Sequence, residues 1–335
     1  LALLAMRQVA WGDQYSHFGV SDTIVDNRAF VSNRGILVAF PLYLYPDNDV
    51  AMLFDHAAMT PWEPDPDHGN RVPNLAPEFV AEMEEKLGLT FDPFCHSDDV
   101  SCHSERGEES RSFDYAQDDR SFDYAQDDRS FDYAQGLTLC FQDDRSFGPR
   151  DILAYVYAVF HSPTYRERYA EFLKIDFPRV PLTSDVDLFW QLVGLGSELI
   201  ALHLLDLSGF KRPDRSGVSF PIPGDNRVKA RGGFPKFIPA GECRTKTSDV
   251  AERNRVYINL EQYFAGVPEE VWDFEVGGYQ VLHKWLKDRK GRVLSYGELE
   301  HYQQMVVGYH GCGALQETLR VMGQVDAVVG GWPMG

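Results

Sequence analysis

The chain has 335 residues, 44% of them hydrophobic and 13% aromatic, which is enough for a packed core and excludes a disordered protein. Its net charge of −19 argues against a nucleic-acid partner only if the charge is spread evenly, so its distribution along the chain decides the question. The longest apolar stretch, residues 188–205, contains Gln191, Glu198 and His203, which excludes a membrane-spanning helix. The five cysteines are irregularly spaced, which favours a reducing, cytoplasmic location.

The N-terminal part, residues 1–94, predicts strands and one helix. Its β-type runs are bounded by Asp, Asn and Gly and lie at residues 18–20, 29–32 and 36–45. An amphipathic helix is expected over residues 77–87, with Phe79, Met83 and Leu87 on one face. The chain starts without a methionine, and we expect it to be the tail of a longer polypeptide.

Residues 95–148 contain a repeated nine-residue unit, RSFDYAQDD, which is complete at Arg111 and Arg120 and shortened to RSFDYAQ at Arg129. Nine residues make two and a half helical turns, so successive copies would present opposite faces and bury no consistent side. The segment holds 11 Asp and 3 Glu against 5 Arg, a net charge of 5 − 14 = −9. We predict an acidic, disordered insertion that carries about half of the chain's negative charge.

Residues 149–205 are expected to form a helical scaffold. A buried helix is predicted over residues 151–160, and Ser162 and Pro163 suit the N-cap and first position of a second helix. A third helix is expected over residues 184–205. The apolar face of the second helix is predicted to hold Tyr165, Tyr169, Phe172 and Leu173.

Residues 206–265 form a basic segment rich in Gly and Pro, with one strand expected over residues 255–260. Between Lys211 and Arg255 there are 11 basic and 5 acidic residues, a balance of 11 − 5 = +6. Such loops between strands can reach phosphates and base edges, although a solvated loop that is basic by chance would look the same. The candidate DNA contacts in this segment are Lys211, Arg212, Arg227, Lys229, Arg231, Lys236, Arg244, Lys246 and Arg255.

The last part, residues 266–335, again predicts helices. Ser295 and Glu298 form a capping box that opens one of them. Gly291 is expected to end the helix before it. The first of these helices is marked by an apolar stripe of Tyr279, Leu282, Trp285 and Leu286. The last is marked by Leu315, Leu319 and Met322. Taken together, the chain predicts a mixed α/β (α+β) fold, with short strands packed on a helical scaffold.

Catalytic motifs are missing from the sequence. There is no Pro-Pro-aromatic loop of the kind that holds a flipped base in amino-methyltransferases, and no GxxxxGK[ST] phosphate loop. Gly194 and Gly196 lie inside an apolar helix, where glycines are expected to permit close packing rather than to bind a dinucleotide. We therefore assign no catalytic residue and no cofactor to this chain.

Two weaker candidates for metal chemistry are also set aside. Asp67, Glu84 and Lys86 resemble the acidic and lysine residues of nucleases, but two residues spaced i and i+2 on a helix do not face each other. Two Cys-His pairs, at residues 95–96 and 102–103, fit no common zinc-finger spacing. We assign no metal site.

Several long strings carry a family resemblance. They are DILAYVYAVFHSPTYRERYAEFLKIDFPRVPL (151–182), the segment 254–303 that begins NRVYINLEQYF, FPLYLYP (40–46), the opening LALLAMRQ with SHFGVSDTIVD, and the terminal GGWP. These strings resemble the C-terminal region of Type ISP restriction–modification enzymes, and the resemblance spans nearly the whole chain except the insertion. In that family one polypeptide carries a nuclease, an ATP-dependent translocase, an adenine-N6 methyltransferase and this region.

The resemblance implies sequence-specific recognition of double-stranded DNA by a target-recognition subdomain formed from residues 1–50 and 206–265. Its partners would be the methyltransferase and translocase domains upstream, which would hold S-adenosylmethionine, ATP and Mg²⁺. Arg7 and Gln8 match the family's Arg-Gln pair and are expected to contact DNA. The insertion and the segment GYHGCG (308–313), which interrupts a usually continuous helix, depart from the family pattern.

Two alternatives remain at this point. The chain could be the remnant of a stand-alone DNA methyltransferase or nuclease, which the absent motifs disfavour. It could also be a degenerate structural fragment that binds no DNA.

Overall fold

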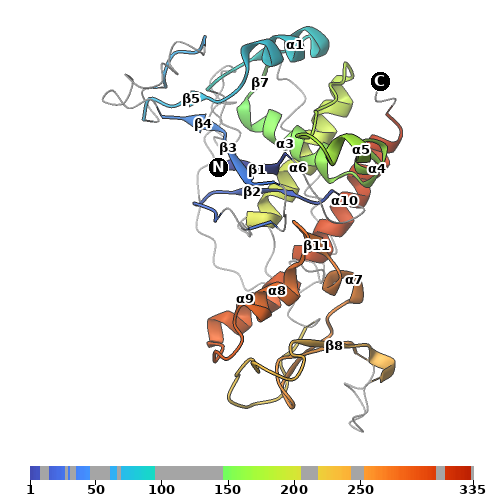
Figure 1. Cartoon of the computed structure of the whole chain (residues 1–335). Coiled ribbons are helices and arrows are strands. Elements are labelled where there is room, and N and C mark those ends of the chain that lie inside the picture. Colours follow the sequence, from blue (N-terminus) through green and yellow to red (C-terminus); the bar gives the residue numbers. More distant parts are fainter. Residues whose placement is uncertain are drawn as a thin grey trace, which may run out of the picture. The chain divides into compact units, whose positions relative to one another are not determined.

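The computed structural model describes residues 1–7, 15–26, 29–30, 35–45, 61–65, 69–94, 146–204, 218–242, 253–306 and 314–332 (Figure 1). The chain divides into two compact units, one made of residues 1–44 and 153–335 and the other of residues 45–152. Helices and several small sheets alternate along the chain, so the predicted mixed α/β fold is confirmed. None of the helices in the described ranges is long and apolar enough to cross a membrane.

The first unit begins with a three-stranded antiparallel sheet. Its central strand, β1 (Ala2–Met6), lies between β2 (Phe18–Ser21) and β3 (Leu37–Pro41). Leu4 and Met6 of β1 are buried with Phe30 in a small apolar cluster. The run LALLAM was not predicted as a strand, because it lacks the alternation of polar and apolar residues that marks one. A further short strand, β4 (Tyr43–Leu44), ends this part of the unit.

The second unit is built from β5 (Val72–Pro73), α1 (Pro77–Leu87), β6 (Thr90–Phe91) and β7 (Ser146–Phe147). The predicted helix is confirmed, but its buried face contains Val80, Met83 and Leu87 rather than Phe79. The Glu84 carboxylate accepts a hydrogen bond from the backbone N–H of Phe91 at 2.7 Å. This bond gives Glu84 a structural role, in keeping with the rejection of a nuclease site.

The acidic insertion requires one correction. Residues 95–145 lie outside the described ranges, so their predicted disorder is untested. Residues 146–148, which we assigned to the insertion, belong to the fold, because β7 pairs in parallel with β6 and Phe147 is 0% exposed. The Gly148 N–H also donates to the Asp151 carboxylate at 2.8 Å. Residues 146–148 are therefore part of the described fold and do not belong to the insertion.

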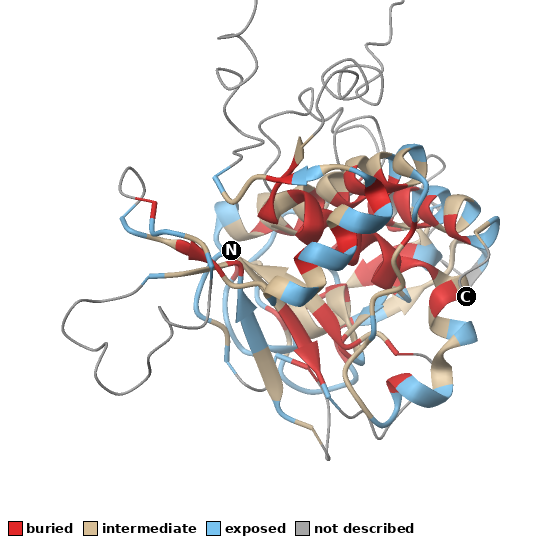
Figure 2. Cartoon of the chain, turned by 90° about the horizontal axis from the view of Figure 1, so that it is seen from above, coloured by how far each residue is buried: buried red, intermediate tan, exposed pale blue. Residues whose placement is uncertain are grey.

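The helices predicted within residues 149–205 are present as α3 (Pro149–His161), α4 (Pro163–Arg168), α5 (Ala170–Leu173) and α6 (Val186–Leu204). Figure 2 shows how buried residues gather in the helices, and every residue from Asp151 to Ser162 is buried. Ser162 caps α4, because its Oγ accepts from the Tyr165 N–H at 3.1 Å. The predicted apolar face is wrong at Phe172, whose side chain is 63% exposed. The predicted single helix is divided, because α4 ends at Arg168 and Tyr169, which is not helical, changes the direction of the chain before α5.

The backbones of helices α3 and α6 are in close contact at Gly196 and Ala154. A Cβ atom added to Gly196 would lie 1.9 Å from the carbonyl oxygen of Ala154, which is shorter than any tolerable contact. A Cβ added to Gly194 would meet nothing within 4 Å. The structure therefore supports close helix packing as the reason for a glycine at position 196.

A buried polar cluster lies between these helices and α4. The Tyr157 hydroxyl is 2.6 Å from Nδ1 of His203, and Nδ1 of His161 is 2.7 Å from the Tyr157 carbonyl oxygen. Burial lowers the pKa of His203 to about 4, with a further contribution from the positive charge of Arg166, so this ring is neutral at pH 7. Arg166 donates to the carbonyl oxygen of Phe160 at 2.7 Å and lies over the Phe18 ring. These contacts describe a structural cluster.

The remaining strands and helices surround a second apolar core. Strands β8 (Lys236–Ile238), β9 (Arg255–Tyr257) and β10 (Tyr263–Ala265) form an antiparallel sheet with β9 in the middle, and β11 (Glu275–Val276) pairs with β12 (Tyr279–Gln280). A short 3-10 helix, η3, spans Ala240–Glu242. The helices are α7 (Glu269–Trp272), α8 (Val281–Lys287), α9 (Tyr296–Val306) and α10 (Ala314–Gly330).

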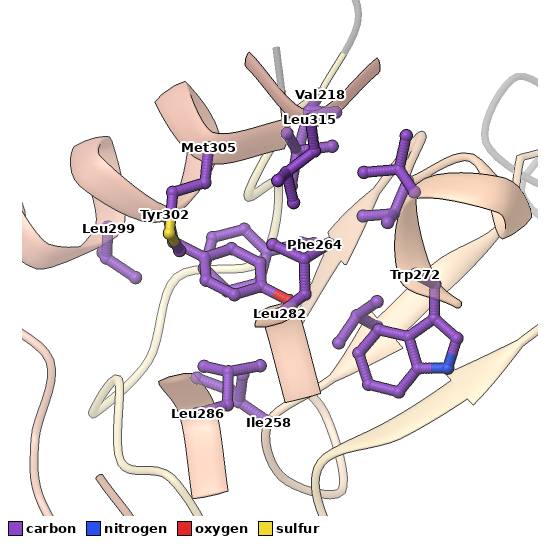
Figure 3. Close-up of a cluster of buried hydrophobic side chains, with 14 of the residues drawn as sticks. Val218, Ile258, Phe264, Trp272, Leu282, Leu286, Leu299, Tyr302, Met305 and Leu315 are labelled. Atoms are coloured by element: carbon purple, nitrogen blue, oxygen red, sulfur yellow. The ribbon is translucent and has the colours of Figure 1, made fainter. Parts of the chain in front are cut away.

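The core beneath these elements is centred on Phe264 and Tyr302, whose ring centroids are 4.3 Å apart (Figure 3). The predicted capping box of α9 is confirmed, since Ser295 Oγ accepts from the Glu298 N–H at 3.2 Å and Glu298 accepts from the Ser295 N–H at 2.9 Å. The segment 308–313 lies outside the described residues.

Helix α10 packs against α4, α6, α7 and α9 (Figure 1). Its Asp326 carboxylate accepts hydrogen bonds from Ser162 Oγ at 2.7 Å and from the Thr164 N–H at 2.8 Å. A carboxylate at the first turn of α4 also interacts favourably with the helix dipole. Asp326 thus connects the C-terminal helix to the scaffold of residues 149–204.

The close approach of α3 and α6 predicts opposite effects for two alanine substitutions on one helix. Gly196→Ala should lower the free energy of unfolding by about 1–3 kcal/mol, because the added methyl group forces the helices apart. Gly194→Ala should raise it by up to about 1 kcal/mol through helix propensity alone. Urea unfolding of the two variants measures both values. Equal stabilisation by the two substitutions would contradict this close packing.

A second experiment tests whether the acidic insertion contributes to stability. Replacing residues 95–145 with a Gly-Ser linker of about twelve residues should leave the melting temperature within a few degrees, since the cost of loop closure changes slowly with length. A linker is needed because parallel strands such as β6 and β7 cannot be joined by a tight turn. Extending the replacement through Phe147 should lower the melting temperature clearly. If both replacements unfold the protein, the acidic repeat has a structural role.

Candidate nucleic-acid interface

The structure describes six of the eleven residues predicted to contact DNA. They are Arg7, Arg227, Lys229, Arg231, Lys236 and Arg255. The other five lie outside the described residues, so their positions stay untested: Gln8, Lys211, Arg212, Arg244 and Lys246.

Arg255 does not fit the prediction. Its side chain is 0% exposed, its guanidinium lies 4.5 Å from the centre of the Tyr263 ring, and one Nη donates to the Tyr257 hydroxyl at 3.3 Å. A guanidinium in this position would have to leave the interior to reach a phosphate. We therefore correct the assignment of Arg255 to a structural role in the sheet of β8, β9 and β10.

Arg7 lies on the surface at the end of β1. Its Nε donates to the Asp176 carboxylate at 3.1 Å, and both side chains remain largely exposed. The pKa of Asp176 is lowered mainly by its hydrogen bond from the Phe177 N–H and further by Arg7. An exposed ion pair of this kind contributes little to stability and leaves Arg7 accessible to solvent.

The basic loop, residues 225–233, carries Arg227, Lys229 and Arg231. Arg227 and Arg231 are exposed, and the ammonium of half-buried Lys229 lies 5.6 Å from the centre of the Phe234 ring. Gly232 and Gly233, with φ of +89° and +80°, turn the chain directly after Arg231 through conformations that other residues rarely adopt. Lys236 follows, exposed, at the start of β8.

A buried glutamine holds this loop in place. Gln262 is 2% exposed, and its amide nitrogen donates to the Ile222 carbonyl oxygen at 3.1 Å and to the Asn226 side chain at 2.8 Å. Its amide oxygen accepts from the Asn226 N–H at 2.9 Å and from the Asn259 side chain at 2.9 Å. All four hydrogen-bonding positions of the carboxamide are therefore occupied. This network fixes the start of the basic loop against the turn between β9 and β10.

The same loop pairs with a segment that was not predicted from the sequence to lie at the interface. The Val228 N–H donates to the Arg292 carbonyl oxygen at 2.9 Å, and the Gly291 N–H donates to the Val228 carbonyl oxygen at 2.7 Å. An Nη of Arg227 donates to the Gly291 carbonyl oxygen at 2.7 Å. The density of basic residues in KWLKDRKGR (284–292) was the available sequence signal, but the strong helical stripe that overlaps it indicated packing instead.

The described ranges contain no group of three or more His, Cys, Asp or Glu residues that could hold a metal ion. The two Cys-His pairs lie outside the described residues, as does Asp67 of the nuclease-like set.

The Gln262 network predicts a large effect for a small change. Gln262→Ala should lower the free energy of unfolding by about 3 kcal/mol, because several buried polar groups lose their partners and each costs about 1–3 kcal/mol. Hydrogen exchange of the Asn226 amide should accelerate, since that amide donates to Gln262. Gln280→Ala is the matched control, because Gln280 makes an exposed bond to Asp273. Equal losses of stability in the two variants would rule out a special role for Gln262.

Two solved structures align with almost the whole chain. "ATP-dependent Type ISP restriction-modification enzyme LlaBIII bound to DNA" has 17% identity and a TM-score of 0.47, over 98% of this chain and 16% of that chain. The "DrdV-DNA complex" has 16% identity and a TM-score of 0.48, over 99% of this chain and 25% of that chain. The chain thus spans a quarter or less of the lengths of these proteins.

A nuclease-deletion mutant of the Type ISP enzyme LlaGI, in complex with a DNA substrate mimic, has 24% identity and a TM-score of 0.31. That match covers 55% of this chain and 14% of the other. No curated protein matches the sequence. The family model described as the Type ISP C-terminal specificity domain matches residues 1–324. The chain therefore belongs to the Type ISP C-terminal specificity domain family.

Proposed function

We propose that this chain selects the DNA sequence on which a Type ISP restriction–modification enzyme acts. The observation that carries the proposal is the match of residues 1–324 to the specificity domain of that family. A specificity domain is the part that recognises the target, which agrees with the absence of catalytic motifs from the sequence.

The basic loop supports a role for DNA contact. Arg227 and Arg231 are exposed, and the loop that carries them is fixed by the fully bonded Gln262 carboxamide. A fixed loop loses little conformational entropy on binding, so its charges can contribute to affinity. Arginine suits this position because its guanidinium forms paired hydrogen bonds with phosphate or with the edge of guanine.

The proposal extends to the other domains of the complete enzyme. Domains upstream of this chain would methylate adenine at N6, translocate on DNA and cleave it. They would require S-adenosylmethionine, ATP and Mg²⁺, and the enzyme would act in the cytoplasm. The DNA-bound state named for LlaBIII and DrdV agrees with double-stranded DNA as the partner.

Selection from random duplexes tests the proposal. The 335-residue chain is immobilised, random-sequence duplexes are bound and eluted over several rounds, and the survivors are sequenced. A shared asymmetric motif is expected. A pool with no preferred sequence would contradict sequence recognition by this chain.

Binding of an Arg231 variant to the selected motif then tests whether this residue reads a base or contacts a phosphate. If Arg231 reads a base, Arg231→Gln should reduce discrimination at one position by about 1–3 kcal/mol. If Arg231 contacts a phosphate, binding to selected and scrambled duplexes should weaken equally. Lys86→Gln on α1 is the control, because Lys86 already pairs with Glu82. An Arg231 variant that behaves like this control would remove Arg231 from the interface.

A further inference from the structure

The end of α8 and the turn that follows it are strongly basic. Residues 284–292 contain five basic side chains (Lys284, Lys287, Arg289, Lys290 and Arg292) and one acidic side chain, Asp288. Lys287 and Lys290 both reach solvent. The pKa of His283 is lowered by partial burial and further by the positive charges of these two lysines. The two ammonium groups therefore act on the same small region of the surface.

Backbone pairing joins this turn to the basic loop. In addition to the bonds through Val228 and Gly291, the Leu294 N–H donates to the Asn226 carbonyl oxygen at 2.9 Å. Arg227 and Val293 face each other as an antiparallel bridge. Two segments about sixty residues apart in sequence thus form one surface. We call the solvent-accessible cations of residues 225–233 and 284–292 the composite basic surface.

Four acidic side chains lie near this surface: Glu261, in the turn between β9 and β10, and three that form ion pairs. Asp225 pairs with Arg227, Asp288 with Lys284, and Glu298 with both Arg289 and Arg292. Eight basic residues against these four acids leave a local charge of 8 − 4 = +4. Within the part of the chain that the structure describes, Lys287, Lys290 and Arg231 form no ion pair or hydrogen bond through their side chains.

We propose that the composite basic surface is a single DNA-backbone site, in which Lys287 and Lys290 contact phosphates beside those reached from the basic loop. The inference rests on the proposed function, and it adds residues from outside the segment 206–265 to the interface. Lysine fits such a task because its compact charge neutralises a phosphate without reading a base. Base readout would then fall to neighbouring side chains, while these lysines position the duplex.

Salt dependence tests the inference. The affinity of the 335-residue chain for a random-sequence duplex of about 25 base pairs is measured by fluorescence anisotropy as salt is raised. Removing one phosphate-binding charge should make the slope of log affinity against log salt less negative by about 0.9, so Lys287→Gln with Lys290→Gln should change it by about 1.8. Between about 50 and 200 mM salt the double variant should therefore lose about 12-fold less affinity than the unsubstituted chain.

A matched control separates local contact from overall charge. Lys86→Gln with Lys174→Gln removes the same two charges from lysines that are paired with Glu82 and Glu171. This control should keep the original slope, and Lys287→Arg with Lys290→Arg should keep it as well. Thermal melting of each variant confirms folding, which these surface substitutions should leave intact.

The possible outcomes distinguish the two proposals. If the unsubstituted chain binds no duplex, the proposed function fails. If it binds but the Lys287 and Lys290 double variant keeps its slope, or changes no more than the control, the composite basic surface is not a phosphate site and the proposed function stands.

Discussion

The arrangement of the candidate interface depends on one buried carboxamide. Gln262 donates twice and accepts twice, and its partners come from the Ile222 backbone, from Asn226 and from Asn259. Gly224 must be a glycine here, because an added Cβ would lie 2.6 Å from the Gln262 side chain. A buried amide that lacks partners is costly, so the network favours a single loop conformation over its alternatives. That conformation pairs the backbone of residues 226–228 with the turn at 291–294.

A positive surface on an acidic protein is physically reasonable when charge is separated along the chain. The net charge is −19, and residues 95–148 alone contribute −9. At physiological salt the Debye length is about 8 Å, so charges farther away than this are largely screened. A phosphate in contact with Lys287 or Lys290 therefore responds mainly to the nearest side chains. The acidic remainder reduces long-range attraction to DNA without cancelling contacts at the surface.

Local signals in the sequence predicted most of the helices, because helix caps and the spacing of apolar residues depend only on residues that are close together in the sequence. Ser162, Ser295 and Glu298 acquire the bonds expected of them. The sequence could not reveal that LALLAM is a central strand, since this depends on partners at 18–21 and 37–41. It also could not distinguish buried Arg255 from exposed Arg231, because Arg255 contacts the Tyr257 hydroxyl and the Tyr263 ring only in the folded sheet. The pairing of 226–228 with 291–294 is likewise a long-range interaction that composition does not encode.

The hydrogen bonds between Asp326 and the cap of α4 have a consequence for the order of folding during translation. Ser162 leaves the ribosome 164 residues before the carboxylate that completes its cap. At about 5–20 residues per second, this interval lasts on the order of ten to thirty seconds. During that time the helices of residues 149–204 lack the face of α10 and expose apolar side chains. Until α10 has been synthesised, the apolar side chains that it covers in the folded chain therefore stay accessible to solvent.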